Sequence, residues 1–347
     1  MKALFIGGTG TISMAITRQL LLDKHDLWLL NRGNRDNGGA KQLKLDINDE
    51  KSVAEAIKNE HFDVVADFIA FKPEQVERDF RLFAGKCSQY IFISSASAYQ
   101  KPVGSYLITE STPLANPFWQ YSRNKIACED FLMEKYRENG FPVTIIRPSH
   151  TYDERSVPLG VHGAQGSWQV IKRMMTGKPV IVHGDGTSLW HMTQNRDFAR
   201  AFIGLMHNIR AIGEAVQITG DETLSWNQIY HCIYNALNIN AEKNGKGRLP
   251  PLEMLHFASE FLAAHSKKCG LHYDFTGGLI GDKANSVVFD NTKLKRLVPG
   301  YHSKIRFDQG VQETIDYCLA HPECQKEDPD FDRWCDTLVD IRKKALA

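Results

Sequence analysis

Two hydroxyl-bearing stretches of this sequence have residue types and spacings suited to proton chemistry. Ser95 closes the apolar run IFISS, and Tyr121 and Lys125 follow in YSRNK. Residues four apart share one face of a helix, so the phenol and the ammonium are neighbours. A tyrosine has a pKa of about 10, which a nearby ammonium lowers, and the pair can then exchange a proton with a carbinol or carbonyl oxygen. Ser95 can hydrogen-bond to the same oxygen. The alternative is that the pair has no catalytic role, because a Y-x-x-x-K spacing alone is also common on ordinary surface helices.

A glycine-rich turn, GGTGTIS, lies near the N-terminus. It follows a short apolar strand and opens a helix, which is the setting of a dinucleotide-binding turn. Gly7 permits the tight turn, Gly10 lets the backbone approach a pyrophosphate, and Ser13 replaces the usual third glycine with another small residue. We predict that this turn binds NAD(P), and a glycine turn without a ligand is the alternative. The other predicted contacts of the turn are Thr9, Thr11 and Ile12.

The end of the second predicted strand bears on the choice between NAD and NADP. An acidic residue here would bind the adenosine ribose, but the sequence has Asn31 followed by Arg32. A guanidinium pairs with a 2′-phosphate, which a carboxylate would repel. We therefore expect NADP(H) to be favoured over NAD(H), with a solvated Arg32 as the alternative. Asp46 and Ile47 end the third strand, where an acid can reach the adenine amine and an apolar side chain can pack on its ring.

These residues lie at the ends of segments that alternate between strand and helix. The runs KALFIGG, DVVADFIAF, QYIFISS and PVTIIRPS are apolar on both faces, and amphipathic helices separate them. This pattern predicts an α/β fold, with a Rossmann-type doubly wound parallel sheet and a smaller interleaved C-terminal α/β part. We place the nucleotide-binding domain at residues 1–155 plus about 193–220, and the substrate-binding part at about 156–192 and 221–347. A cleft between them would hold a small-molecule substrate.

The composition narrows the classes of function. Among 347 residues, 42 are Lys or Arg and 41 are Asp or Glu, so the formal net charge is +1. This balance argues against a nucleic-acid partner, and no apolar run is long enough to span a bilayer. The seven cysteines form no C-x-x-C pair, the N-terminus has no signal-peptide pattern, and the histidines have no metal-ligand spacing. These features predict a cytoplasmic protein with free thiols and no metal site.

Taken together, the motifs resemble those of an extended short-chain dehydrogenase/reductase of the NAD-dependent epimerase/dehydratase superfamily. The matching stretches, in the order of the family, are GGTGTIS, ISSASAY, YSRNK, IIRPSHTYD and GDG followed by RDFA, and FDNTKLKRLVPGY is similar to its C-terminal segment. The resemblance implies that Tyr121 is the catalytic acid/base. It also implies that Lys125 contacts the nicotinamide ribose and tunes Tyr121, and that Ser95 contacts the substrate oxygen.

Further assignments concern the rest of the cofactor and the substrate. The resemblance puts residues 147–150 beside the nicotinamide, and the cofactor contacts that we assign in addition are Phe68, Pro148 and His150. The aromatic segment SLWHM can form a wall for a ring-shaped substrate, with a core-packing tryptophan as the alternative. The residues assigned to the substrate are Ser97, Trp190 and His191. The resemblance also implies a homodimer formed through residues 73–86 and the helix that bears Tyr121.

Two departures from the family pattern bear on the substrate. Dehydratases of sugar nucleotides carry an Asp-Glu pair where this chain has Ala96 and Ser97, so that acid and base are missing. Members that bind sugar diphosphates have an arginine where this chain has Trp190, which cannot neutralise a diphosphate. The candidates to replace that arginine are Arg155, Arg173 and Arg196. The segments GGTGTIS, NRG and HGDGTSLWHMTQNRDFA are similar to an atypical branch related to chloroplast stem-loop RNA-binding proteins of the same fold.

Two functions from different classes follow. The first is an NAD(P)-dependent oxidoreductase or epimerase that acts on a secondary alcohol or ketone of a sugar-like or sugar-nucleotide substrate, with Ser95, Tyr121 and Lys125 as its catalytic set. The second is a non-catalytic dinucleotide-sensing or RNA-binding member of the same fold. The near-neutral charge and the retained Ser-Tyr-Lys set favour the first.

Overall fold

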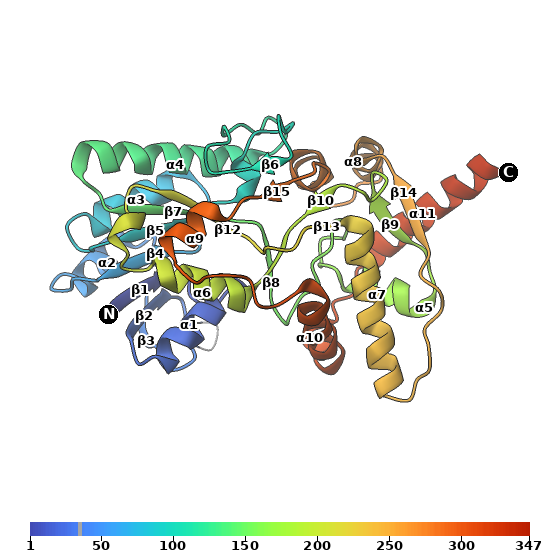
Figure 1. The fold of residues 1–347 in the computed structure, drawn as a ribbon, viewed down its shortest axis with the longest axis horizontal. Coiled ribbons are helices and arrows are strands. Elements are labelled where there is room, and N and C mark those ends of the chain that lie inside the picture. The colour runs from blue at the N-terminus through green and yellow to red at the C-terminus, as the bar shows by residue number, and fades with distance from the viewer. Residues whose placement is uncertain (34–36) are drawn as a thin grey trace.

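Seven parallel strands form the central sheet of the protein (Figure 1). The computed structural model describes residues 1–33 and 37–347. Across the sheet, the strands are β12 (Ala215–Ile218), β7 (Val143–Pro148), β5 (Tyr90–Ile93), β4 (Val64–Asp67), β1 (Lys2–Ile6), β2 (Asp26–Asn31) and β3 (Lys41–Lys44). The strands at the centre are buried on both faces because helices cover both sides of the sheet. The predicted doubly wound α/β fold is confirmed.

Among the described residues, three helices pack on each face of the sheet. One face carries α1 (Ser13–Leu22), α6 (Asn195–Leu205) and α9 (Thr292–Leu297), and the other carries α2 (Glu50–Ala56), α3 (Pro73–Phe83) and α4 (Gln120–Asn139). In Figure 1, α4 lies above the sheet while α1 and α6 lie below it. In each helix the apolar residues recur at helical spacing and form one face, and this face packs against the sheet. Helix α4 ends at Gly140, whose φ of 66° is the left-handed conformation that glycine adopts easily.

The strand order changes direction at the centre of the sheet. β1 pairs with β2 on one side and with β4 on the other, so the connections after these strands leave in opposite directions. In sheets of this kind a crevice opens at the carboxyl ends of the strands, at this switch point. The glycine turn begins directly after β1, and therefore lies at the crevice.

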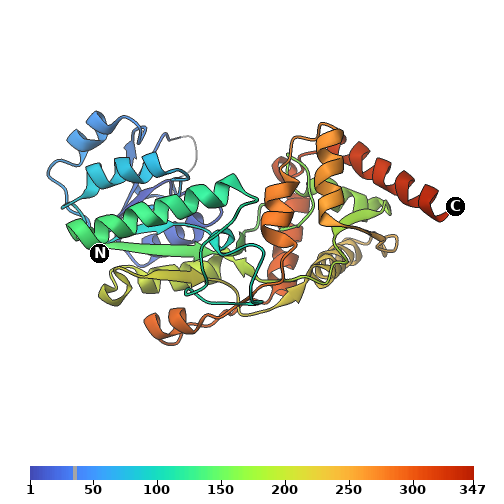
Figure 2. The ribbon, with the colours of Figure 1, turned by 90° about the horizontal axis from the view of Figure 1, so that it is seen from above.

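The second part of the chain builds a separate apolar core at the end of the molecule opposite the N-terminus (Figure 2). Its helices are α5 (Trp168–Thr176), α7 (Trp226–Lys243), α8 (Ser259–Lys268), α10 (Phe307–Ala320) and α11 (Pro329–Leu346), with a π-helix at Thr276–Lys283. Its strands form two-stranded pairs: β9 (Val180–His183) with β14 (Met254–Phe257), and β10 (Leu189–Trp190) with β13 (Leu224–Ser225). Two further pairs join the parts: β8 (His150–Tyr152) with β11 (Met192–Gln194), and β6 (Leu107–Ile108) with β15 (Val288–Phe289).

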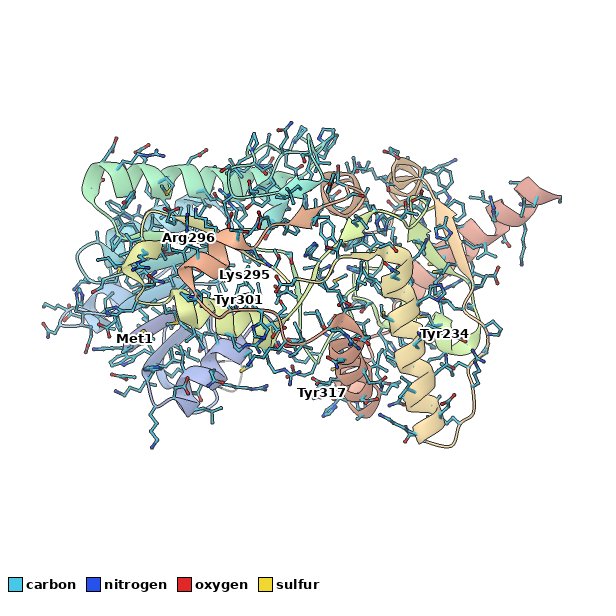
Figure 3. The ribbon with its side chains drawn as sticks, viewed as in Figure 1. Met1, Tyr234, Lys295, Arg296, Tyr301 and Tyr317 are labelled. Atoms are coloured by element: carbon cyan, nitrogen blue, oxygen red, sulfur yellow. The ribbon has the colours of Figure 1, made fainter. Side chains whose placement is uncertain are left out.

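One segment departs from the predicted division of the chain. The sequence analysis places everything after residue 221 in the substrate-binding part, but Leu294, Leu297 and Tyr301 pack with α6 in the core beneath the sheet. Figure 3 shows Tyr301 beside α6, far from Tyr234 on α7. The apolar residues of α9 fit this face because Gly204 leaves room for Val298. The remaining domain boundaries stay a prediction.

Candidate active site

The glycine turn after β1 leaves open space at the start of α1. A side chain at Gly10 would meet nothing nearer than the Oγ atom of Ser13, at 3.7 Å. Ser13 is buried, and its Oγ accepts a hydrogen bond of 2.9 Å from the N–H of Gly10. No side chain caps the first turn of α1, where Ile12 is the N-cap, so backbone N–H groups there are available to an anion. The turn therefore has the shape and the polarity that a pyrophosphate requires.

The predicted residues of the turn have different surroundings. Gly7 has a φ of 101°, and a side chain there would come within 3.1 Å of Ile69, so only glycine fits without strain. Gly7 and Thr9 line the crevice. The carbonyl of Thr11 accepts a 3.3 Å hydrogen bond from Asn195 Nδ2, which ties the turn to the start of α6. The side chain of Ile12 packs against the core under the sheet, so only its backbone faces a ligand.

A cavity of about 630 Å³ continues the crevice along the ends of β2 and β3. Asn31, Arg32, Asp46 and Ile47, the four residues assigned to the adenosine half of the cofactor, all line it. The Oδ1 atom of Asn31 accepts hydrogen bonds from Gly33 N–H at 2.9 Å and from a glutamine on β3 at 2.7 Å. Its buried Nδ2 has no partner among the described residues. This orphaned donor suits a ribose hydroxyl or a 2′-phosphate oxygen.

The charges around this cavity favour an anion. Arg32 is exposed at its rim, and Asp46 is the one carboxylate among the described residues that line it. Lys44 covers Gly33, where a side chain would lie 2.8 Å from Lys44 Cε. Sequence reasoning missed Lys44 and the Gln42 side chain that orients Asn31. The parallel register, which pairs Asn31 with Lys44, is the signal that could have found them.

The loop after β4 contains Phe68, whose assignment to the cofactor stays a prediction. The ring of Phe68 packs against Phe5 and Phe202, with centroids 5.1 Å and 5.6 Å away, and so belongs to the core beneath the sheet. The next residue, Ile69, lines the cavity instead. Asp67 Oδ1 shapes this loop by accepting hydrogen bonds from the N–H groups of Ile69 at 2.5 Å and Ala70 at 2.8 Å.

The predicted Ser-Tyr-Lys set comes together at the carboxyl ends of β4 and β5. Lys125 is 2% exposed, and its Nζ donates to the carbonyl oxygens of Ala70 and Ile93, both at 2.6 Å. Ser95 lies close enough to the Tyr121 hydroxyl to act on its pKa. The ammonium lies 5.8 Å from the centre of the Tyr121 ring. The loop after β4 and the end of β5 therefore hold Lys125 by hydrogen bonds. The first turn of α4 places Tyr121 near Ser95.

The protonation of this set differs from the expectation. Burial raises the pKa of Tyr121 to about 12, and the hydrogen bond with Ser95 opposes this rise only in part. Burial also lowers the pKa of Lys125 to about 8. The direction is opposite to the one expected from Lys125: desolvation of the phenol is the largest cause, and Ser95 rather than the ammonium opposes it. Tyr121 is a neutral phenol, and so a proton donor.

Ser97, assigned to the substrate, lies one layer behind Ser95. It is buried, and its Oγ forms hydrogen bonds with the hydroxyls of Ser95 at 2.9 Å and Ser122 at 2.8 Å. Its N–H also donates to Ser95 Oγ at 3.1 Å. These contacts place Ser97 to orient the Ser95 hydroxyl, and its assignment to the substrate stays a prediction.

Pro148 and His150 follow the last central strand. Pro148 is buried at the end of β7, whereas His150 is half-buried and lines a cavity of about 150 Å³ together with Thr11. Burial lowers the pKa of His150 to about 3, so its ring is neutral. The ring makes no side-chain hydrogen bond to another residue that the structure describes. Its place beside the glycine turn keeps it a candidate cofactor contact.

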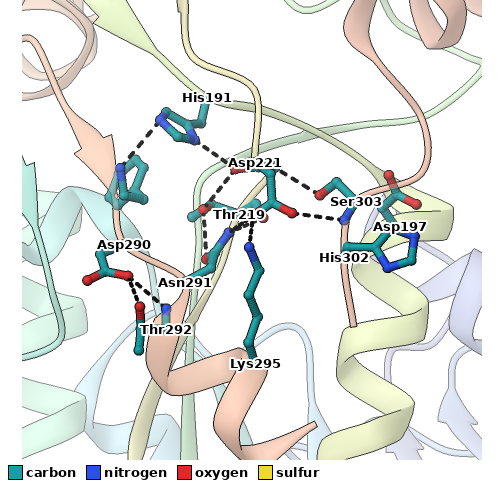
Figure 4. A network of polar contacts seen from close by, with 12 residues as sticks. His191, Asp197, Thr219, Asp221, Asp290, Asn291, Thr292, Lys295, His302 and Ser303 are labelled. Atoms are coloured by element: carbon teal, nitrogen blue, oxygen red, sulfur yellow. Dashed lines mark hydrogen bonds and ion pairs between the residues drawn. The ribbon is translucent and has the colours of Figure 1, made fainter. Parts of the chain in front are cut away.

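Trp190 and His191 are not placed to contact a substrate. Trp190 is 3% exposed and packs 5.9 Å from the ring of Trp226 in the C-terminal core. His191 is held at both ring nitrogens: Nδ1 donates to the Gly220 carbonyl at 2.7 Å, and Nε2 accepts from Thr223 Oγ1 at 2.9 Å. Figure 4 shows His191 with a polar contact at each ring nitrogen. Both assignments are corrected, because the aromatic segment fills the core rather than a cleft wall.

The three arginines considered as diphosphate ligands are all engaged in ion pairs. Arg155 pairs with Asp153, Arg196 pairs with Glu313, and the buried Arg173 pairs with two aspartates of α11.

Among the described residues, no cluster of three His, Cys, Asp or Glu side chains is arranged to hold a metal ion. Within the same residues, no helix combines the length and apolar character needed to cross a bilayer.

Comparison with known proteins identifies the class to which this fold and site belong. The model of the NAD dependent epimerase/dehydratase family matches residues 3–219. The chain therefore belongs to this family, as the motifs predict. The match covers the whole sheet with the glycine turn and the Ser-Tyr-Lys set.

Individual relatives are distant. A 2′-dehydrokanamycin reductase of Streptomyces kanamyceticus is 22% identical over 240 residues, which cover 68% of this chain and 67% of the relative. A chloroplast stem-loop binding protein of 41 kDa of Arabidopsis thaliana is 26% identical over 274 residues, or 74% of this chain and 66% of that protein. The structure of a dTDP-glucose 4,6-dehydratase of Bacillus anthracis in complex with NAD superposes with a TM-score of 0.68 at 17% identity, over 93% of this chain and 98% of the other. At that identity the likeness concerns the fold.

Proposed function

We propose that this protein is an NAD(P)-dependent oxidoreductase or epimerase that acts on a secondary alcohol or ketone of a sugar-like substrate. The observation that carries the proposal is the gathering of Ser95, Tyr121 and Lys125 beside the carboxyl ends of β4 and β5. Ser95 acts on the pKa of Tyr121, and the Lys125 ammonium, held by the carbonyls of Ala70 and Ile93, lies 5.8 Å from the centre of the Tyr121 ring. The relatives named as a reductase and as UDP-glucose 4-epimerases support this reaction class.

The residues of the crevice fit a dinucleotide. The open space at Gly10 and the uncapped start of α1 suit the pyrophosphate, and the orphaned Nδ2 of Asn31 suits the adenosine ribose or its 2′-phosphate. Arg32 and Lys44 support a preference for NADP(H). When bound, the nicotinamide would supply or accept the hydride at the substrate carbon.

The protein's own residues handle the proton and the substrate oxygen. In the direction of reduction, the neutral Tyr121 hydroxyl donates its proton to the carbonyl oxygen, and Ser95 hydrogen-bonds to the same oxygen. Lys125 acts by position: its ammonium stabilises the phenolate that remains. In the reverse direction the phenolate takes the proton back. Return of the hydride to the other face of the ketone would give epimerisation instead of net oxidation or reduction.

The test is hydride transfer followed by nicotinamide absorbance, with a panel of sugars, sugar nucleotides and the corresponding keto compounds. We expect turnover with wild type and a loss of about 10²- to 10⁴-fold in Tyr121→Phe, the range typical of a removed acid/base. Tyr106→Phe is the matched control, because Tyr106 is 64% exposed, and it should turn over like wild type. Equal rates in Tyr121→Phe and wild type would refute the proposal.

The similarity to the chloroplast stem-loop binding protein supports a second candidate, a non-catalytic RNA-binding role. This role requires no Tyr-Lys pair and predicts salt-sensitive binding of structured RNA. A gel-shift titration separates the two. RNA binding unchanged in Lys125→Met, together with no hydride transfer in wild type, would favour the second candidate.

A further inference from the structure

Four consecutive backbone N–H groups in the loop between β4 and α3 donate to only two side chains. Asp67 Oδ1 accepts from the N–H groups of residues 69 and 70, at 2.5 Å and 2.8 Å. Gln75 Oε1 accepts from those of residues 71 and 72, at 2.6 Å and 3.0 Å. Because each N–H group of this stretch has a partner, the backbone of the loop has one defined path.

The peptide unit between Ala70 and Phe71 is hydrogen-bonded on both sides. Its carbonyl oxygen, which belongs to Ala70, accepts the 2.6 Å hydrogen bond from Lys125 Nζ. Its N–H, which belongs to Phe71, donates to Gln75 Oε1 at 2.6 Å. A peptide unit is planar, so the direction of its N–H fixes the direction of its carbonyl. Gln75 therefore determines how this carbonyl meets the buried ammonium.

The Phe71 side chain follows the same peptide unit. Its ring centre lies 4.6 Å from Lys125 Nζ and 6.3 Å from the centre of the Tyr121 ring. An aromatic face attracts an ammonium placed over it. The loop thus presents both a carbonyl oxygen and an aromatic ring to Lys125, and the orientation of one peptide unit controls both contacts.

Gln75 also caps helix α3, but this role does not account for all of its contacts. The N–H of Lys72, the N-cap residue, donates to Gln75 Oε1, as in a capping box. A cap needs only this hydrogen bond, whereas the shorter one, to Phe71, lies outside the helix. Gln75 and Ile69 line the cavity assigned to the cofactor. The side chain that orients the peptide unit therefore also borders that cavity.

We propose that Gln75 is a positioning residue of the reaction, which holds the Lys125 ammonium beside Tyr121 through the peptide unit of residues 70–71. This inference rests on the proposed function, to which it adds a residue. Gln75 acts on the ammonium only by fixing the carbonyl that the ammonium binds. Without Gln75 Oε1 this peptide unit is free to rotate, and Lys125 keeps only the Ile93 carbonyl as a fixed acceptor.

The test is steady-state hydride transfer at saturating NADP(H). The substrate is the compound of the panel of sugars, sugar nucleotides and keto compounds that wild type turns over fastest. Gln75→Ala should lower kcat about tenfold, the effect of one lost hydrogen bond to a charged group, and leave the KM of the substrate unchanged. Gln75→Glu keeps an acceptor oxygen at the same place and should restore most of kcat.

Gln228→Ala is the matched control. Gln228 has the same position in the capping box of α7, where its Oε1 accepts from the N–H of Ser225 at 2.8 Å. The substitution is the same and also removes a helix cap, but it lies in the C-terminal part of the chain. We expect urea unfolding to show similar losses of stability in Gln75→Ala and Gln228→Ala, and kcat to fall only in Gln75→Ala.

A double-mutant cycle with Lys125→Met tests the route of the effect. If Gln75 acts through the ammonium, Gln75→Ala should lower kcat in wild type and cause no further loss in Lys125→Met. A merely structural role would lower kcat by the same factor in both backgrounds. The cycle therefore distinguishes positioning of Lys125 from general loosening of the domain.

Three outcomes overturn the inference and leave the proposed function intact. These are an unchanged kcat in Gln75→Ala, a loss in Gln75→Glu as large as that in Gln75→Ala, and equal fractional losses in the two backgrounds of the cycle. If wild type transfers no hydride to any compound of the panel, the proposed function itself is refuted, and this inference with it.

Discussion

Lys125 gives the most specific prediction about the candidate active site. The perturbation is Lys125→Met, which keeps the length of the side chain and removes the ammonium. In wild type the ammonium is buried, donates hydrogen bonds to the carbonyls of Ala70 and Ile93, and lies over the rings of Phe71 and Phe92. Burial lowers the pKa of Lys125 from its ordinary value of 10.5 to about 8. Removing this group should therefore change how the stability of the protein depends on pH.

The sign and size of the effect follow from proton linkage. Below about pH 8, Lys125 carries its proton in both the folded and the unfolded state, so it contributes no pH dependence. Between about pH 8 and 10.5 the unfolded chain holds a proton that the folded protein has lost, so the free energy of unfolding rises with pH. At 1.36 kcal/mol per pKa unit, wild type should gain about 3 kcal/mol over the variant across this range.

The assay is urea unfolding of both proteins at a series of pH values between neutral and about 10.5. Buried tyrosines and cysteines also titrate at high pH, but they are common to both proteins and cancel in the difference. Lys246→Met, a substitution of an exposed lysine, should show no such difference from wild type. A difference between wild type and Lys125→Met that stays constant with pH would refute the assignment of a desolvated lysine.

Two further predictions concern stability and assembly. Glu129→Gln should cost about 3–5 kcal/mol of unfolding free energy in urea, because it leaves the buried Arg147, now 2.6 Å from Glu129, without its counter-charge. Glu50→Gln, which breaks an exposed pair, should change little, and equal losses in the two variants would contradict this account. We also propose that α3 and α4, which pack side by side, form a dimer interface. Ala127→Arg, at a half-exposed position of α4, should then shift sedimentation from dimer to monomer, whereas a monomeric wild type would disprove the interface.

The sheet and the cofactor crevice were predictable because local sequence determines them. Apolar runs of strand length between amphipathic helices allow little besides a covered parallel sheet. In such a sheet, residues that directly follow central strands meet at one edge. This is why Asn31, Asp46 and Ser95, far apart in the chain, all reach the crevice or the site beside it. Tyr121 and Lys125 lie one helix turn apart in α4, so their position on one helix face was also predictable from the sequence.

The remaining features depend on packing that single-sequence patterns do not contain. Trp190 and His191 lie in an aromatic segment that could equally line a cleft, yet both are buried, and Trp190 pairs with Leu224 in the C-terminal core. Phe68 and Ile69 are adjacent, and only the path of the loop decides which one faces the cavity. Asp282, which acts on the pKa of Tyr121, follows it by almost half of the chain, so only the fold brings the two together. The raised pKa of Tyr121 likewise depends on burial, which spacing does not reveal.

Dinucleotide binding tests the central claim most directly. The measurement is calorimetric titration of wild type and Arg32→Ala with NAD, NADH, NADP and NADPH. We predict that NADP and NADPH bind more tightly than NAD and NADH, and that Arg32→Ala weakens the phosphorylated pair about tenfold or more, because a charge-assisted hydrogen bond is lost. Tight binding of NAD that is indifferent to Arg32 would contradict the preference for NADP. Absence of binding by all four dinucleotides would contradict the account as a whole.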